Sequence, residues 1–329
     1  MKKLIALLSV LTLTISTYGQ DVDKLIDQKD VARIIETLAA DDMQGRGTFT
    51  PGIEKAATFI ESEFKNIGLQ PLQGNTGFRQ VVDVKALDRI PTRGNIAEKL
   101  NNNPLFNVVG VLPGKSKPDE YVIFSAHYDH LGIVKAMQGD SIANGADDDA
   151  SGTTAVITLA KYFKKLDNNA RTLIFVAFTA EEIGGFGAQY FSKMVNPDKT
   201  VAMFNIEMIG KASKFGENSA FITGFERSDF GTILQKNLEG TAFKFHPDPY
   251  PEQQLFYRSD NATLARLGVP AHTISTDQID IDKLYHTVKD EFSSLDVKNI
   301  TATIKAIALS SRGVVAGTET PTRVAKLER

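Results

Sequence analysis

Three adjacent carboxylates stand out in the stretch NGADDDASGT, which begins at residue 144. Asp147, Asp148 and Asp149 lie side by side among small residues, and adjacent like charges repel each other. A solvated turn, or a cap for a following helix, would explain the cluster without any chemistry. A bound cation would instead cancel the repulsion and would use at least one of these Asp residues as a ligand.

Further residues of the same chemical type follow apolar runs that predict buried β-strands. The run 121–126 is followed by His127, with Asp129 two residues later. The run 172–180 is followed by Glu181 and Glu182, and the run 201–206 is followed by Glu207. Ligands of open α/β sheets lie outside the carboxyl ends of the strands, so these side chains and the Asp cluster are expected to meet in one crevice. Each has a plain alternative, since paired Glu residues also favour a helix N-terminus.

His, Asp and Glu without Cys are the ligands of a catalytic zinc site or of a pair of zinc ions. A pair needs a bridging carboxylate, which holds the metals about 3.5–4 Å apart. A calcium loop starting at Asp147 fits less well, because its twelfth position is Thr158 rather than Glu. Phosphate-loop and nucleophile-elbow motifs fail at Val109 and Ala143, where each requires Gly, and no HExxH motif is present.

The composition narrows the class of protein. The chain has 329 residues, 42% of them apolar, which is enough for a substantial core in one large domain or two small ones. A net charge of −3 offers no basic field for nucleic acid. The absence of cysteine excludes disulfides, thiolate nucleophiles and Cys-based zinc sites.

The N-terminal segment has the order of a secretory signal: MKK, then the apolar run LIALLSVLTLTI, then STYGQD. Residues 1–19 are therefore predicted to be a signal peptide, and 20–329 a single domain. The apolar run is shorter than the roughly 20 residues of a spanning helix, so a membrane anchor is the less favoured interpretation. The expected location is the periplasm or the extracellular space.

Apolar runs and helical periodicity alternate along the chain. Helices are expected at 22–42, 51–68, 150–166, 187–195, 230–240 and 297–315, and strands at 106–114, 121–127, 172–178, 201–207, 219–224 and 270–276. Continuous apolar strands separated by helices predict an α/β fold, with a mostly parallel mixed sheet flanked by helices on both faces.

Five blocks in this order resemble the co-catalytic zinc aminopeptidases: AHYDHLG, GADDDASG, FTAEEIGGFGAQYF, NIEMIG and LYHT. This family includes bacterial leucyl aminopeptidases, aminopeptidase Y and glutamate carboxypeptidase. The likeness begins near GRGTFTPGIEKAATFIESEFKNIGLQP and extends to the last helix. Each block is moderately specific, but five in order make a strong signal.

The resemblance implies two zinc ions per chain and a role for each matching residue. The implied zinc ligands are His127, Asp148, Glu182, Glu207 and His286, with Asp148 as the bridge. Glu181 would be the general base and Tyr285 would help to hold the oxyanion. The carboxylate of Asp129 would fix the tautomer of His127.

Two departures from the family pattern bear on the substrate. Glu207 stands where the family has Asp, and its extra methylene moves the carboxylate by a bond length or more. SDN at 259–261 stands where SDH is common, and Arg258 and Asp260 are expected to line the substrate pocket. Asp149 is expected to cap the following helix, and three histidines are expected to be structural: His130, His246 and His272.

The implied function is a secreted or periplasmic zinc exopeptidase, most simply an aminopeptidase acting on peptides. A carboxypeptidase or a glutaminyl cyclase on the same fold is the alternative among enzymes. The alternative outside enzymes is a non-catalytic binding protein, which would be expected to lack ligands or the base. Zinc stoichiometry separates the cyclase from the two-metal enzymes.

Overall fold

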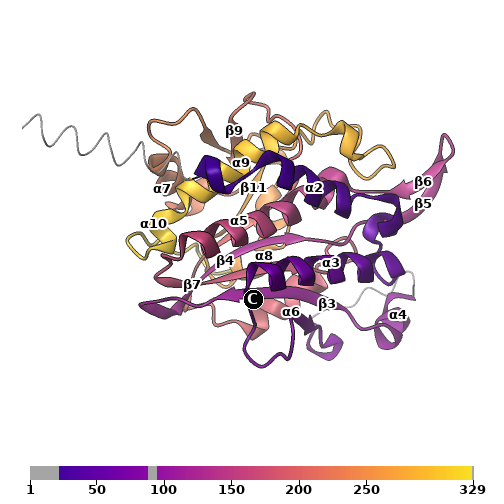
Figure 1. Ribbon diagram of the computed structural model, residues 1–329, viewed down its shortest axis with the longest axis horizontal. Helices are drawn as coiled ribbons and strands as arrows, with labels where there is room; N and C mark the ends of the chain where they lie inside the picture. The colour runs from indigo at the N-terminus through magenta and orange to yellow at the C-terminus, as the bar shows by residue number, and fades with distance from the viewer. Residues whose placement is uncertain (1–21, 88–94, 328–329) are drawn as a thin grey trace, which may run out of the picture.

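A mixed β-sheet forms the centre of the molecule in the computed structural model, which describes residues 22–87 and 95–327 (Figure 1). The proposed signal peptide lies outside these residues. The strand order is β1-β3-β7-β4-β8-β11-β9-β10, with β2 pairing beside β3. The strands are β1 (Gln70–Pro71), β2 (Arg79–Val81), β3 (Phe106–Leu112), β4 (Lys117–His127), β7 (Arg171–Phe178), β8 (Thr200–Ile206), β9 (Ser219–Ile222), β10 (Lys244–Pro247) and β11 (Ala271–Ser275).

Four neighbouring strands, β7, β4, β8 and β11, run parallel to one another. In the register of the central pairs, His127 lies opposite Phe178 on β7 and Ser125 opposite Asn205 on β8. β3 joins the parallel block antiparallel to β7. The carboxyl ends of β4, β7 and β8 therefore meet at one edge of the sheet, as the sequence predicted.

Helices cover both faces of the sheet (Figure 1). One layer contains α2 (Gln28–Leu38), α3 (Pro51–Ile67), α5 (Gly152–Leu166) and α9 (Val297–Ser310), and the other contains α6 (Phe186–Met194) and α8 (Asn261–Ala265). The remaining helices are α4 (Ile96–Asn102), α7 (Phe230–Asn237) and α10 (Arg312–Val315). Short helical turns are η1 (Asp41–Arg46), η2 (Val84–Ala86), η4 (Ala146–Ser151), η5 (Phe225–Arg227), η6 (Pro251–Gln253), η7 (Leu255–Tyr257) and η8 (Phe292–Ser294).

The core under α5 is built around Phe124 in the centre of β4. Its ring stacks on Phe163 of α5, Phe175 of β7 and Phe204 of β8, with ring centroids 5.4, 5.5 and 4.9 Å apart. Such contacts between one helix and three strands fix α5 over the sheet. The predicted α/β fold is confirmed.

A two-stranded hairpin, β5 (Gly132–Met137) and β6 (Asp140–Ala143), projects from the domain directly after the His127 segment (Figure 1). No strands were expected at these residues from the sequence. The hairpin returns the chain to the Asp cluster at η4. Within the described residues, no helix combines the length and apolar character needed to cross a membrane.

Candidate metal centre and active site

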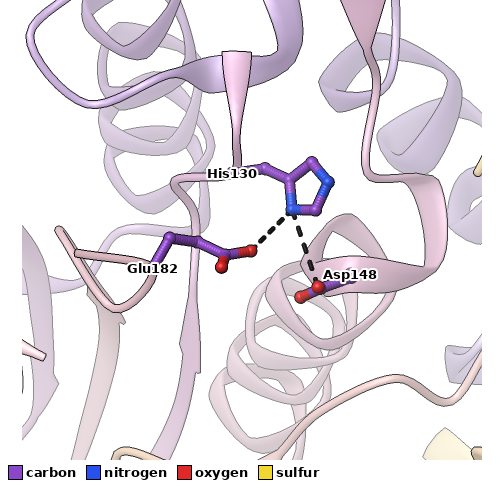
Figure 2. A group of neighbouring side chains, drawn as sticks. All are labelled: His130, Asp148 and Glu182. Atoms are coloured by element: carbon purple, nitrogen blue, oxygen red, sulfur yellow. Dashed lines mark hydrogen bonds and ion pairs between the residues drawn. The ribbon is translucent and has the colours of Figure 1, made fainter. Parts of the chain in front are cut away.

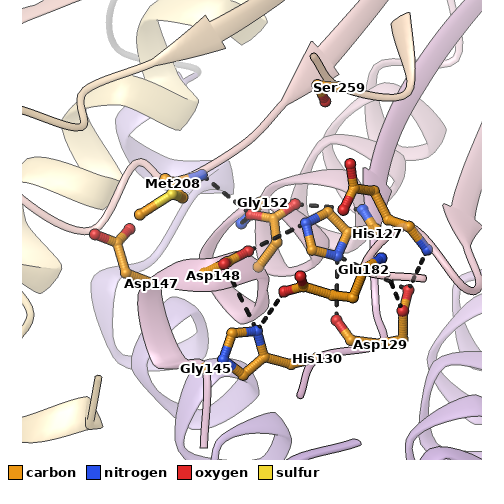
Figure 3. Close-up of polar contacts among 12 residues, drawn as sticks. His127, Asp129, His130, Gly145, Asp147, Asp148, Gly152, Glu182, Met208 and Ser259 are labelled. Atoms are coloured by element: carbon orange, nitrogen blue, oxygen red, sulfur yellow. Dashed lines mark hydrogen bonds and ion pairs between the residues drawn. The ribbon is translucent and has the colours of Figure 1, made fainter. Parts of the chain in front are cut away.

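Three of the predicted ligand residues, His127, Asp148 and Glu182, lie close together beyond the carboxyl ends of the parallel strands (Figure 3). His127 ends β4, and the Glu181–Glu182 pair follows β7 after two residues. Glu207 follows β8 directly, and His286 lies in the long segment after β11. The structure thus brings together side chains from segments far apart in the sequence.

Asp148 lies between two histidines. Its Oδ1 is 3.2 Å from His127 Nε2, and its Oδ2 is 3.1 Å from His286 Nε2. His286 Nε2 is also 3.2 Å from Glu182 Oε2. Burial by itself raises the pKa of Asp148, but His130, His127 and His286 together hold it well below its usual value. One carboxylate oxygen toward each histidine is the arrangement that a bridging ligand requires.

His130 belongs to the same group, although the sequence left it as structural. Its Nδ1 donates to Glu182 Oε1 at 2.8 Å and lies 3.6 Å from Asp148 Oδ2 (Figure 2). The donor atoms of His130, Asp148 and Glu182 all lie within 4.8 Å of one another. The ring packs against Gly145, where an added Cβ would come within 2.5 Å of it. A second histidine therefore contacts the Asp148–Glu182 pair beside His286.

The three adjacent residues Asp147, Asp148 and Asp149 have different surroundings. The carboxylate of Asp149 accepts hydrogen bonds from the backbone N–H groups of Gly152 at 2.9 Å, Met208 at 3.2 Å and His127 at 3.3 Å. It therefore bonds the first residue of α5, as expected of a cap, and ties that helix to two strand ends. The peptide bond that joins Asp148 to Asp149 is cis.

Asp147 points away from the two histidines. Its Oδ1 accepts from the Gly210 N–H at 2.7 Å and its Oδ2 is 3.2 Å from Lys211 Nζ. The sequence left Asp147 without a firm role. Its contacts join the cluster to the segment after β8.

Two buried residues hold the backbone of the Asp cluster in place. The carboxylate of Asp290 accepts from the N–H groups of Asp147 at 2.9 Å and Asp148 at 3.0 Å. Arg46 is fully buried and donates to backbone carbonyls on three segments: Leu38, Tyr128, Asn144, Gly145 and Asp148. The turn that carries the three Asp residues is therefore held by two groups. The Asp290 carboxylate accepts from its N–H groups, and the Arg46 guanidinium donates to its carbonyl groups.

Asp129 contacts His127 through its backbone rather than its side chain. His127 Nδ1 donates to the Asp129 carbonyl oxygen at 3.1 Å, whereas the nearest carboxylate oxygen is 3.9 Å away. With Nδ1 held by this bond, Nε2 is the ring nitrogen that faces Asp148. The Asp129 carboxylate instead accepts from the N–H groups of Glu181 and Glu182, at 3.0 and 3.3 Å. The contact expected to fix the His127 tautomer is therefore made by the Asp129 backbone carbonyl and not by its carboxylate. The Asp129 carboxylate positions Glu181 and Glu182 instead.

Three acidic side chains, Glu181, Glu207 and Asp260, have a pKa above the ordinary value of their groups. Burial is the largest cause, and it raises the pKa of Glu181 well above its ordinary value, with Glu207 and Asp260 adding to the shift and His127 opposing it. Burial raises the pKa of Asp260 to about 8, with Glu207 and Asp129 adding to the shift and His127 opposing it. Neither oxygen of Asp260 has a hydrogen-bond partner among the described residues.

Tyr285 and Arg258 flank the space beside these acids. The Tyr285 ring stacks on His286, with centroids 3.8 Å apart. Both Tyr285 and Arg258 line the cavity that Asp148, Glu181, Glu207 and His286 also line. Arg258 is exposed and donates to Gln253 Oε1 at 3.1 Å, so its guanidinium is held at the mouth rather than in the interior. All ten predicted site residues lie in or beside one crevice.

The donor set fits zinc. Imidazole and carboxylate groups are the usual zinc ligands in catalytic sites. The carboxylates here are buried and lie close together, which is costly without a compensating positive charge. His127 Nε2 is aimed at the group by its Nδ1 bond, as is common for a zinc-ligating histidine.

Residues 107–310, more than half of the chain, match the model of peptidase family M28, and the chain belongs to this family. The assignment made from the five motifs is confirmed. Leucine aminopeptidase 1 of Ajellomyces capsulatus is 27% identical over 205 residues, which are 58% of this chain and 51% of that protein. The chain spans about half the length of the first curated relatives that it matches.

Solved structures share the fold at low sequence identity. BSAP, a zinc aminopeptidase from Bacillus subtilis, superposes with a TM-score of 0.67 at 14% identity, covering 88% of this chain and 95% of that one. Porphyromonas gingivalis glutaminyl cyclase superposes with a TM-score of 0.65 at 15% identity, covering 88% and 99%. These similarities show that the chain shares its fold with a protein named as a zinc aminopeptidase and with one named as a glutaminyl cyclase.

Proposed function

We propose that this protein is a zinc-dependent aminopeptidase that binds two zinc ions and removes N-terminal residues from peptides. The observation that carries the proposal is the Asp148 carboxylate placed between His127 and His286, with one oxygen toward each. Glu207 on the His127 side and Glu182 on the His286 side would complete two ligand sets that share Asp148. When bound there, zinc would activate water near neutral pH and polarise the scissile carbonyl.

Glu181 is the group in the crevice best placed to move protons. It follows β7 and lines the cavity beside the ligand residues without an ion-pair partner among the described residues. It would accept a proton from the attacking water and return that proton to the leaving amine. Burial holds its pKa above the ordinary value, which brings the group nearer to the range in which it can do both.

Tyr285, Asp260 and Arg258 have complementary roles toward the substrate. The Tyr285 hydroxyl would donate to the oxyanion that develops on the scissile carbonyl. Asp260 would bind the free α-amine, because a buried carboxylate without a hydrogen-bond partner among the described residues is stabilised by a cation. Arg258 at the cavity mouth would contact the peptide beyond the scissile bond.

We also propose that residues 1–19 direct export and that 20–329 fold as one peptidase domain in the periplasm or outside the cell. The basic start, apolar run and small residues of the first segment support this.

The test is a panel of fluorogenic substrates assayed with zinc-loaded protein of measured metal content. Aminoacyl amides with a free α-amine are expected to be cleaved at least about 100-fold faster than their N-acetylated counterparts, with two zinc ions per chain. Hydrolysis of the acetylated substrates alone would remove the aminopeptidase proposal. Release of ammonia from an N-terminal Gln peptide without hydrolysis, at one zinc per chain, would establish the cyclase instead.

His130 supports a separate prediction about the metal. Replacing it with Ala removes the bond to Glu182 and leaves that carboxylate free to turn, so zinc affinity is expected to fall about 10–100-fold. Competition against a chromophoric chelator measures this directly. His246→Ala is the control, because His246 stacks on Phe215, away from the ligand set. Equal zinc affinity in the His130 and His246 variants would contradict the role.

A further inference from the structure

A small cavity of about 80 Å³ opens beside the proposed ligands. Its lining includes Asp148, Glu181 and His286, and also Phe221, Leu255, Ile279 and Asp277. One buried water needs about 10–15 Å³, so the cavity holds roughly six atoms. That is the size of one amino-acid side chain next to the reacting centre.

Asp277 also lines this cavity and is not among the residues of the proposed site. Asp277 lies two residues after the end of β11 and is 5% exposed. Its Oδ1 has no hydrogen-bond partner within the described residues. Two hydroxyl groups of the lining are already committed: Ser275 Oγ donates to the Met208 carbonyl at 3.1 Å, and Thr273 Oγ1 donates to Asn261 at 3.0 Å. Outside the residues of the proposed site, Asp277 is therefore the acid of this lining that is available to a polar ligand.

The surroundings of Asp277 are short of positive charge. Lys211 is the nearby cation, and it pairs with Asp282 at 2.7 Å and Asp147 at 3.2 Å rather than with Asp277. Burial raises the pKa of Asp277 to about 8, and Asp147 and Asp282 add to the shift. A cationic group in the cavity would offset both the burial and the repulsion.

We propose that this cavity holds the side chain of the substrate's N-terminal residue and that Asp277 selects lysine or arginine there. The proposal rests on the aminopeptidase function proposed above. The methylene stem of a basic side chain would pack on Phe221, Leu255 and Ile279, while its cationic head would reach Asp277. An acidic side chain would be repelled by the same carboxylate.

The experiment compares kcat/KM for lysyl and norleucyl aminomethylcoumarin, which share an unbranched stem and differ in the cationic head. The wild type is expected to prefer lysine by at least about tenfold, since a charge-assisted hydrogen bond in a buried site is strong. Asp277→Asn conserves the volume and is expected to lower the lysyl value about tenfold or more, with the norleucyl value changed less than about threefold. Asp280→Asn is the matched control, because the Asp280 side chain is 48% exposed on the same loop.

A binding measurement tests the role of Asp277 without relying on the catalytic rate. Calorimetric titration of zinc-loaded protein is expected to show lysinamide binding more tightly than norleucinamide, and the difference is expected to disappear in Asp277→Asn. Cleavage of free-amine substrates with no preference for lysine would overturn the assignment of Asp277 alone. Failure to cleave any free-amine substrate would overturn the aminopeptidase proposal, and the specificity inference with it.

Discussion

Replacing Glu181 with Gln is expected to lower kcat for peptide hydrolysis by about 10³-fold or more while leaving zinc in place. The variant keeps the size and the burial of the side chain but cannot accept the proton of the attacking water, and general bases contribute about 10²–10⁴-fold to rate. The measurement is steady-state hydrolysis of an aminoacyl amide, with zinc content determined on the same sample.

Glu182→Gln is the matched comparison, because the neighbouring carboxylate is bonded by His130 at 2.8 Å and lies 3.2 Å from His286. Its loss is expected to lower zinc content together with activity. The zinc content would thus distinguish the roles of the two adjacent Glu residues, although both variants are expected to have low activity. Near wild-type turnover in Glu181→Gln would refute its assignment as the base.

Replacing Arg46 with Met is expected to lower the free energy of unfolding by about 3–5 kcal/mol, the range seen when a buried charged group loses its partners. Met matches the length of the stem but removes the side-chain donor from five backbone carbonyls: those of Leu38, Tyr128, Asn144, Gly145 and Asp148. The Gly145 carbonyl keeps a bond from the Ala150 N–H at 3.2 Å. Each unsatisfied buried acceptor costs about 1–3 kcal/mol before relaxation. Urea denaturation of the zinc-free protein isolates this effect from the metal.

Arg33→Met serves as the control for Arg46. Arg33 also makes two ion pairs, with Asp30 at 2.8 Å and Glu63 at 2.9 Å, but 45% of its side chain is exposed. Exposed pairs are worth about 0.2–1 kcal/mol. If the Arg46 variant loses no more stability than the Arg33 variant, Arg46 does not support the metal-site loop as described.

The sequence predicted the parts of the site that depend on strand periodicity. His127, Glu182 and Glu207 come directly after, or within four residues of, buried strands, and parallel pairing brings such positions to one edge whatever the loops do. The apolar runs alone were sufficient to predict that edge.

The parts that depend on loop geometry could not be predicted in the same way. His130 lies three residues after His127 in the same motif, but counting two required histidines favoured a structural role for it. Asp290 follows His286 by four residues and shows no pattern of its own. Its contact with the N–H groups of Asp147 and Asp148 is set by how the segment after β11 folds back. The β5–β6 hairpin did carry a signal, the Gly139–Asp140 turn between alternating residues.

The proposed ligands come from five segments that meet only in the complete sheet, and this links metal binding to the folding equilibrium. A chain that has not yet paired β4, β7 and β8, or placed the segment after β11, contains the same side chains without the site. Zinc held by all of them would stabilise the native state alone, by about 2.7 kcal/mol when free zinc is 100 times the dissociation constant. Zinc supply would then set the lifetime of the folded protein as well as its catalytic rate.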